Sequence, residues 1–268
     1  MNKISIKLEE LKQQQKTALV SYVVAGDPDL DTSFDIIDKL IESGTDVIEL
    51  GMPFSDPVAD GQTIQNSSNR SLSNNISLQD ILELTKKITE KHPNIPIILM
   101  GYFNPINKYG INQFLEDANN VSGLIIVDLP YEEIINYPVL RKQKKIPLIN
   151  LITPLTSKDR LKKINKISSE FLYYVSVFGT TGTKEPELEK VKNNILQVKK
   201  QTSLKIAVGF GIKSGSQIAE LKKAADLIVI GSAYCQIIEK HLNDKNNMLL
   251  QLEEFNKEIT KFLFAEGS

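Results

Sequence analysis

Short apolar runs rich in β-branched residues alternate with longer segments whose apolar residues recur every three or four positions. Eight of the runs have the length and composition of strands, and apart from Glu49 they carry no charge near their middles. Such runs are typical of parallel strands buried on both faces. The predicted strands are Ala18–Val24, Val47–Leu50, Ile97–Met100, Leu124–Val127, Leu148–Ile152, Phe171–Val177, Ile206–Val208 and Leu227–Ile230.

The segments between these runs have the apolar spacing of amphipathic helices. Helices are predicted at Ser33–Ile41, Leu78–Lys91, Glu187–Lys199 and Ser214–Lys223, and from a cap at Ser157 through Ile167. Two further helices, Ile4–Gln14 and Met248–Phe264, flank the series. Pro138 is expected to break or kink a helix within Tyr131–Lys144, because proline lacks the N–H that a helix interior needs.

Strand and helix alternate eight times with no linker-like stretch between them. We therefore predict a single-domain (β/α)₈ TIM barrel over residues 1–268, with extra N-terminal and C-terminal helices. An open doubly wound sheet is the alternative. In a barrel the active site lies in the loops that follow the C-terminal ends of the strands.

The charge balance argues against a polyanionic partner, because 32 basic residues face 33 acidic ones. Neither nucleic acid nor a membrane surface is expected as a partner. No apolar run reaches the length of a transmembrane helix, and residues 1–15 do not read as a secretory signal. The single cysteine, Cys235, cannot form an internal disulfide, which favours a reducing compartment.

The scarcity of histidine limits which residues can bind a metal or act as catalytic acids and bases. With only His92, His241 and Cys235 there is no zinc ligand set, and both histidines are expected to be solvated residues at helix ends. Acid and base catalysis therefore falls to carboxylates, tyrosine or lysine.

A long loop after the second predicted strand carries two candidate carboxylates, Glu49 and Asp60. If Val47 faces the barrel interior, Glu49 does so too, and burial should raise its pKa toward values useful for proton transfer. The intervening prolines can return Asp60 to the same pocket. The alternative is that Asp56 and Asp60 form turns and cap a helix starting at Gly61. This alternative is the better explanation for Asp56, because Ser-Asp-Pro is a typical turn sequence.

Glycine-containing loops follow the last three strands: Gly179-Thr-Thr-Gly182, Gly209-Phe-Gly211 and Gly231-Ser-Ala233. Barrels bind phosphate with such loops and with the N-terminus of a short helix, because backbone N–H groups can approach the oxygens closely. Gly231-Ser232 opens such a helix over Ala233–Leu242. The spacing Gly209-x-Gly211-x-x-x-Gly215 departs from the dinucleotide fingerprint, which argues against a nicotinamide site.

Other polar and aromatic residues follow the middle strands. Tyr102 can flank an aromatic ligand, and Asp128 can accept hydrogen bonds or pair with a partner's loop. Tyr173 and Tyr174 are adjacent on a predicted strand, so one of them must face the inside of the barrel. For each of them, core packing is as good an explanation as a role in ligand binding. The residues alone thus indicate a lyase or isomerase acting on a phosphorylated small molecule, without a metal or bound cofactor.

The segment Glu49–Gly61, ELGMPFSDPVADG, closely resembles the signature of the tryptophan synthase alpha chain family. Loops similar to that family's occur in order along essentially the whole chain. They are Tyr102-Phe-Asn-Pro105, Asp128-Leu-Pro130, Gly179-Thr-Thr-Gly182, Gly209-Phe-Gly211 and Gly231-Ser-Ala233.

The resemblance implies retro-aldol cleavage of indole-3-glycerol phosphate to indole and glyceraldehyde 3-phosphate. Glu49 would be the principal acid and base, and Asp60 would bind the indole N–H. Thr181 would contact Asp60 when the loops close. The substrate pocket would be formed by Tyr22, Met100, Tyr102, Tyr173, Thr181, Gly182, Gly211, Gly231 and Ser232, the last four of which match the family's phosphate cradle.

The resemblance also implies a complex with a beta chain that holds pyridoxal phosphate (PLP) and receives indole through a tunnel, in an alpha2beta2 assembly. No cofactor is expected in this chain. The cytoplasm of a bacterium and the plastid stroma both fit. The chain departs from the family's usual residues at Gln62, Gly101, Lys184 and Lys213, none of which removes a catalytic group.

Three alternatives remain at this point. A stand-alone indole-releasing lyase would need no beta chain, and a catalytically silent subunit would only activate a partner. Retention of both Glu49 and Asp60 argues against the silent subunit. An isomerase on another phosphate-binding barrel would lack the long Pro-Phe-Ser-Asp-Pro signature.

Overall fold

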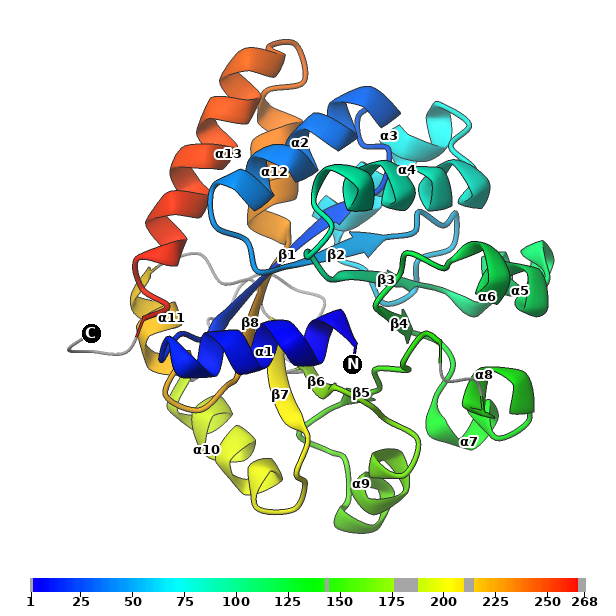
Figure 1. Cartoon of the computed structure of the whole chain (residues 1–268), viewed down its shortest axis with the longest axis vertical. Coiled ribbons are helices and arrows are strands. Elements are labelled where there is room, and N and C mark those ends of the chain that lie inside the picture. The colour runs from blue at the N-terminus through cyan, green and yellow to red at the C-terminus, as the bar shows by residue number, and fades with distance from the viewer. Residues whose placement is uncertain (1, 143–144, 176–187, 210–214, 265–268) are drawn as a thin grey trace.

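The fold is a ring of parallel strands surrounded by helices, seen in a computed structural model that describes residues 2–142, 145–175, 188–209 and 215–264 (Figure 1). Within these ranges the eight strands pair in the order β4-β3-β2-β1-β8-β7-β6-β5. A parallel bridge between Leu124 and Leu148 brings β4 against the segment before β5 and closes the ring. The predicted barrel is confirmed, and the open sheet is wrong.

The strands follow the predicted runs closely. They are β1 (Ala18–Val24), β2 (Val47–Gly51), β3 (Ile97–Gly101), β4 (Gly123–Ile126), β5 (Leu151–Ile152), β6 (Phe171–Val175), β7 (Lys205–Gly209) and β8 (Leu227–Ile230). The main difference is β5, whose ladder pairing is two residues long against the predicted Leu148–Ile152. Residues 176 and 177, predicted to extend β6, lie outside the described residues.

The helices around the ring are α2 (Leu30–Glu42), α3 (Gln62–Ser73), α4 (Leu78–Lys91), α5 (Phe103–Tyr109), α6 (Ile111–Asp117), α7 (Tyr131–Ile134), α8 (Pro138–Lys142), α9 (Lys158–Asn165), α10 (Leu188–Lys199), α11 (Gly215–Leu221) and α12 (Ser232–Lys240). Pro138 separates α7 from α8 and starts the second of them, because proline is tolerated in the first helical turn. Helices α5 and α6 were not predicted. They are short and are divided by Gly110 at φ 98°.

Two apolar clusters divide the core between the inside and the outside of the barrel. The inner cluster takes alternate residues of the strands, such as Val20, Val47 and Ile98, while their neighbours pack under the outer helices. Helix α1 (Lys3–Gln13) lies across one end of the ring in Figure 1, and its Ile4 and Leu11 belong to the inner cluster. The extra helix therefore plugs the barrel.

The second extra helix, α13 (Lys245–Thr260), packs against α2. Its Asn256 is fully buried, and its side-chain amide donates to the carbonyl of Leu40 (3.1 Å) and to the hydroxyls of Ser43 (2.9 Å) and Thr45 (3.3 Å). Asn256 in turn accepts a hydrogen bond from Tyr234 of α12. A buried polar network thus joins α2, α12 and α13.

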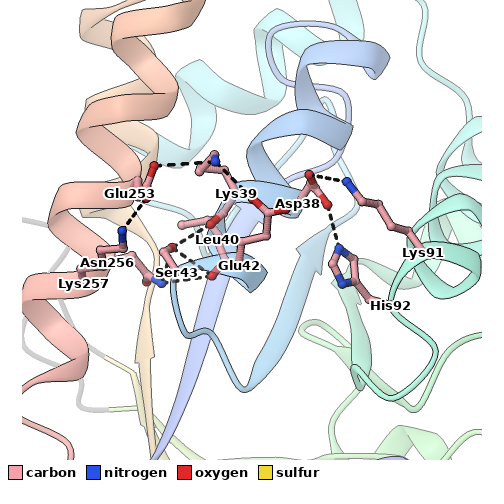
Figure 2. A network of polar contacts seen from close by, with 10 residues as sticks. All are labelled: Asp38, Lys39, Leu40, Glu42, Ser43, Lys91, His92, Glu253, Asn256 and Lys257. Atoms are coloured by element: carbon pink, nitrogen blue, oxygen red, sulfur yellow. Dashed lines mark hydrogen bonds and ion pairs between the residues drawn. The ribbon is translucent and has the colours of Figure 1, made fainter.

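Figure 2 shows that α2 is held from both sides. Toward α13, Lys39 pairs with Glu253 at 3.6 Å. Toward α4, Asp38 pairs with Lys91 and His92, each at 2.7 Å. Although burial raises the pKa of Asp38, hydrogen bonds from Lys91 and His92 lower it below its usual value. His92 is therefore a structural partner at the end of α4 and not simply a solvated residue.

Asn256→Ala is expected to lower the free energy of unfolding by about 3 kcal/mol, because it leaves the buried hydroxyl of Tyr234 without its acceptor and opens a gap. Urea unfolding followed by circular dichroism measures the change. The control is Lys257→Ala on the same helix. It removes only the exposed 2.6 Å pair with Glu253 and should change stability little. Equal losses in both variants would contradict a special role for the buried network.

Candidate functional site

Glu49, the middle residue of β2, points into the barrel. Its strand neighbour two residues earlier, Val47, belongs to the inner cluster, and strand alternation puts Glu49 on the same side. The side chain is buried, and no described residue forms a hydrogen bond with either carboxylate oxygen. Burial raises the pKa of Glu49 to about 8. The carboxyl group is therefore mostly protonated at neutral pH.

Asp60 lies in the loop between β2 and α3. Burial raises the pKa of its carboxyl group, while a hydrogen bond from the hydroxyl of Tyr102 partly lowers it. Helix α3 has Gly61 at its N-cap and no side-chain capping bond, so the alternative that Asp60 caps this helix is wrong. Asp56 does form a turn, in which its carbonyl accepts from the N–H of Val58 at 2.9 Å.

Tyr22 is the residue of β1 that pairs in register with Glu49. Burial raises the pKa of the Tyr22 hydroxyl well above its ordinary value, and the charges of Asp60 and Glu49 raise it further. The strand residue Glu49 and the loop residue Asp60 thus both lie within electrostatic reach of Tyr22.

Tyr102 ties the Asp60 loop to the end of β3. Its hydroxyl accepts from the N–H of Ala59 at 3.1 Å and donates to the carboxylate of Asp60. Its ring is almost fully buried and packs on Phe54, with ring centroids 5.2 Å apart. The sequence suggested that Tyr102 flanks a ligand. The geometry shows in addition that it holds the backbone of Ala59, the residue before Asp60, a contact that depends on loop folding and has no sequence signal.

Tyr22 is held between two glycines. A Cβ at Gly51 would lie 2.4 Å from its hydroxyl, and a Cβ at Gly231 would lie 2.9 Å from its ring. Both distances are shorter than side chains tolerate. Gly231 is therefore needed to make room for Tyr22, and so is Gly51, a residue beside Tyr22 that the sequence analysis missed.

Tyr173 is the inward-facing member of the tyrosine pair on β6, and Tyr174 packs among the outer residues. Burial, and after it the charge of Glu49, raises the pKa of Tyr173. Its hydroxyl lies over Gly209, where a Cβ would be only 2.2 Å away. Glycine at this position makes room for a tyrosine beside Glu49.

Met100 of β3 is half-buried and packs against the inner cluster. Asp128, just after β4, accepts from the N–H of Phe103 at 2.7 Å, so the first of its two predicted roles is present. The unusual Gly101 also has a physical reason. A Cβ there would lie 2.8 Å from the end of Met52.

Gly231 and Ser232 begin α12 as predicted, with Gly231 at the N-cap and Ser232 half-buried. Their backbone N–H groups open a nine-residue helix at the same end of the barrel as Glu49, a suitable place for an anion. The other predicted members of the cradle, Gly182 and Gly211, lie outside the described residues, as do Thr181, Lys184 and Lys213.

Across residues 2–142, 145–175, 188–209 and 215–264, no group of three or more His, Cys, Asp and Glu side chains is placed to hold a metal ion. In the same ranges no helix is both long and apolar enough to span a membrane. The buried Glu49 and the half-buried Asp60 remain the strongest candidates for chemistry.

The comparisons with known proteins agree on one family. The family model described as tryptophan synthase alpha chain matches residues 8–263. A tryptophan synthase alpha chain from Caldanaerobacter subterraneus is 43% identical over 257 residues, which are 95% of this chain and 97% of that protein. The crystal structure of the alpha chain from Legionella pneumophila superposes with a TM-score of 0.91 at 35% identity, covering 100% of this chain and 99% of that one.

A tryptophan synthase structure from Mycobacterium tuberculosis superposes with a TM-score of 0.86 at 25% identity, covering 98% of this chain and 100% of that chain. Sequence identity and structural similarity therefore indicate the same family over nearly the full length of the chain. The chain belongs to the tryptophan synthase alpha chain family.

Proposed function

We propose that this chain is a lyase that catalyses the alpha reaction of tryptophan synthase, the retro-aldol cleavage of indole-3-glycerol phosphate to indole and glyceraldehyde 3-phosphate. The observation that carries the proposal is the placement of Glu49, buried without a described partner and with its pKa raised to about 8, beside Tyr22 and within the electrostatic reach of Tyr173. A carboxyl group in that state can give up and take back a proton near neutral pH.

Glu49 acts first as an acid and then as a base. Its carboxyl group protonates the indole ring carbon that bears the side chain, and the ring becomes a positively charged indolenine. The bond from that carbon to the glycerol chain then breaks, and its electron pair restores the aromatic ring. The glycerol hydroxyl on the departing carbon loses its proton to the Glu49 carboxylate as the aldehyde forms. One carboxyl group thus completes a balanced proton cycle.

Asp60 stabilises the charge that develops on the ring nitrogen. Its carboxylate accepts the hydrogen bond of the indole N–H, which strengthens as the nitrogen becomes positive. The hydroxyl of Tyr102 donates to the same carboxylate and keeps it oriented. Met100, Tyr22 and Tyr173 supply the walls on which the indole ring packs.

The phosphate binds at the start of α12, where the N–H groups of Gly231 and Ser232 and the Ser232 hydroxyl are available. Gly182, Gly211 and Thr181 belong to the same proposed substrate site. We further propose that the chain works as one barrel domain and binds a beta chain that holds PLP and consumes the indole. The tryptophan synthase structures among the similar proteins support that partner.

The test is an indole-release assay on the purified chain with indole-3-glycerol phosphate, with and without a tryptophan synthase beta chain. Slow release that accelerates strongly when the beta chain is added supports the proposal. Rapid release without any acceleration supports the stand-alone lyase. No release in either mixture supports the silent subunit and overturns the assignment of catalysis.

A further inference from the structure

Helix α3, which begins two residues after Asp60, is attached to the barrel mainly by polar contacts. Its fully buried residues are all serines: Ser67, Ser68 and Ser71. The hydroxyl of Ser71 donates to the carbonyl of Ala25 at 2.7 Å. A helix with so little buried apolar surface takes its position from directional hydrogen bonds and ion pairs.

The principal contact is an ion pair between Arg70 and Asp27, a residue of the loop after β1. The guanidinium donates from Nε to one carboxylate oxygen (2.7 Å) and from Nη2 to the other (2.8 Å). Asp27 is buried and also accepts from the hydroxyl of Ser67. A bidentate pair of this kind fixes angle as well as distance.

A second contact joins α3 to α12. The Oε1 atom of Glu239 accepts from the side-chain amide of Asn66 at 2.9 Å and from Nη1 of Arg70 at 3.3 Å. Glu239 lies two turns beyond Ser232 on the helix whose N-terminus is the proposed phosphate site. These five residues, Asp27, Asn66, Ser67, Arg70 and Glu239, are named here the polar seat of α3.

The first turn of α3 holds the backbone of Asp60. The side-chain amide of Gln65 donates to the Asp60 carbonyl at 2.8 Å, and the carbonyl of the adjacent Gly61 accepts from the N–H groups of Ile64 and Gln65. Any rotation of α3 on its seat would therefore move the Asp60 backbone with it.

We propose that the polar seat of α3 is a positioning device that sets the Asp60 carboxylate relative to the phosphate-binding end of α12. The proposal rests on the proposed function, since it assigns the seat a role in the same reaction. In this proposal Asn66, Arg70 and Glu239 act through Asp60 and not through contact with the substrate. The seat links the helix proposed to hold the phosphate to α3, whose first turn holds the backbone of Asp60.

The test compares Glu239→Ala, which removes both contacts to α3, with Glu239→Gln, which keeps an oxygen that can accept from Asn66 and Arg70. Glu258→Ala, at an exposed position on α13, is the matched control. For Glu239→Ala we expect kcat for indole release to fall about tenfold, because small misplacements of a catalytic group are costly. The dissociation constant of glycerol 3-phosphate, measured by calorimetry, should change less than about twofold. Glu239→Gln and the control should stay within about twofold of the parent.

A second measurement separates positioning from general loosening. In an Asp60→Asn background, where the group being positioned is already altered, Glu239→Ala should lower kcat by less than about twofold. Asn66→Ala, which cuts one contact of the seat and also the hydrogen bond that Asn66 accepts from Gln62 within α3, should show the same dependence on Asp60 if Glu239→Ala folds poorly. A full tenfold loss in both backgrounds, or a parallel loss of glycerol 3-phosphate affinity, would overturn the proposal. If the parent itself releases no indole, the proposed function is what fails.

Discussion

Replacing Glu49 by glutamine is expected to lower kcat for indole release by roughly 10²–10⁴-fold, the usual contribution of a well-placed acid and base. Glutamine keeps the shape of the side chain but can neither donate the ring proton nor accept the hydroxyl proton. No other described residue near Glu49 is well suited to make both proton transfers. The other carboxylate, Asp60, is held by Tyr102, and burial raises the pKa of the nearby tyrosines still higher.

The measurement is a single-turnover assay at saturating enzyme, which detects slow chemistry. The control is the binding of glycerol 3-phosphate, because it measures the phosphate site and requires no proton transfer by Glu49. We expect its dissociation constant to stay within about threefold of the parent. Turnover near the parental value in Glu49→Gln would show that another group moves the protons and would remove Glu49 from the mechanism.

The position of Glu49 could be predicted from the sequence because it depends on a local rule. Side chains alternate along a strand, so the direction of Glu49 followed once Val47 was placed inside the barrel. The register with Tyr22 and the closure of the ring depend on strand pairing, yet the repeated strand and helix pattern already favoured a barrel.

Contacts between loops could not be predicted in the same way. The hydrogen bond from Tyr102 to Asp60 joins residues far apart in the chain, and the pair formed by Arg70 and Asp27 does the same. A polar side chain gives no periodic signal for its partner. The serine-rich sequence of α3 is typical of a surface helix and does not indicate the polar seat on which the helix lies.

Some differences between prediction and structure have a local cause. The sequence Phe103-Asn104-Pro105 has the composition of a turn but begins a helix, since proline is tolerated in a first turn. At β5 the apolar run from Leu148 is buried as predicted, but only its last two residues form a ladder with β6. Hydrophobicity predicts burial better than it predicts backbone pairing.

Glu49→Gln is also expected to stabilise the ligand-free protein increasingly as the pH rises from about 5 to about 8. In the folded chain the pKa of Glu49 is about 8, and in the unfolded chain it returns to the ordinary value of 4.5. Between these values the unfolded state releases a proton that the folded state keeps. Stability of the parent therefore falls as the pH rises, by about 1.4 kcal/mol per pH unit from this group alone. Glutamine does not ionise in this pH range, so the variant does not lose stability for this reason as the pH rises.

The measurement is the difference in free energy of unfolding between parent and variant, from urea titrations at several pH values. Groups with lowered pKa values, such as Asp38, lose their stabilising effect toward acid pH in both proteins and cancel in the difference. We expect a small difference near pH 5 and one of a few kcal/mol near pH 8. A difference that does not grow with pH would mean that the Glu49 carboxyl group ionises normally in the folded chain. Its burial would then fail to hold the proton that the proposed cleavage of indole-3-glycerol phosphate requires.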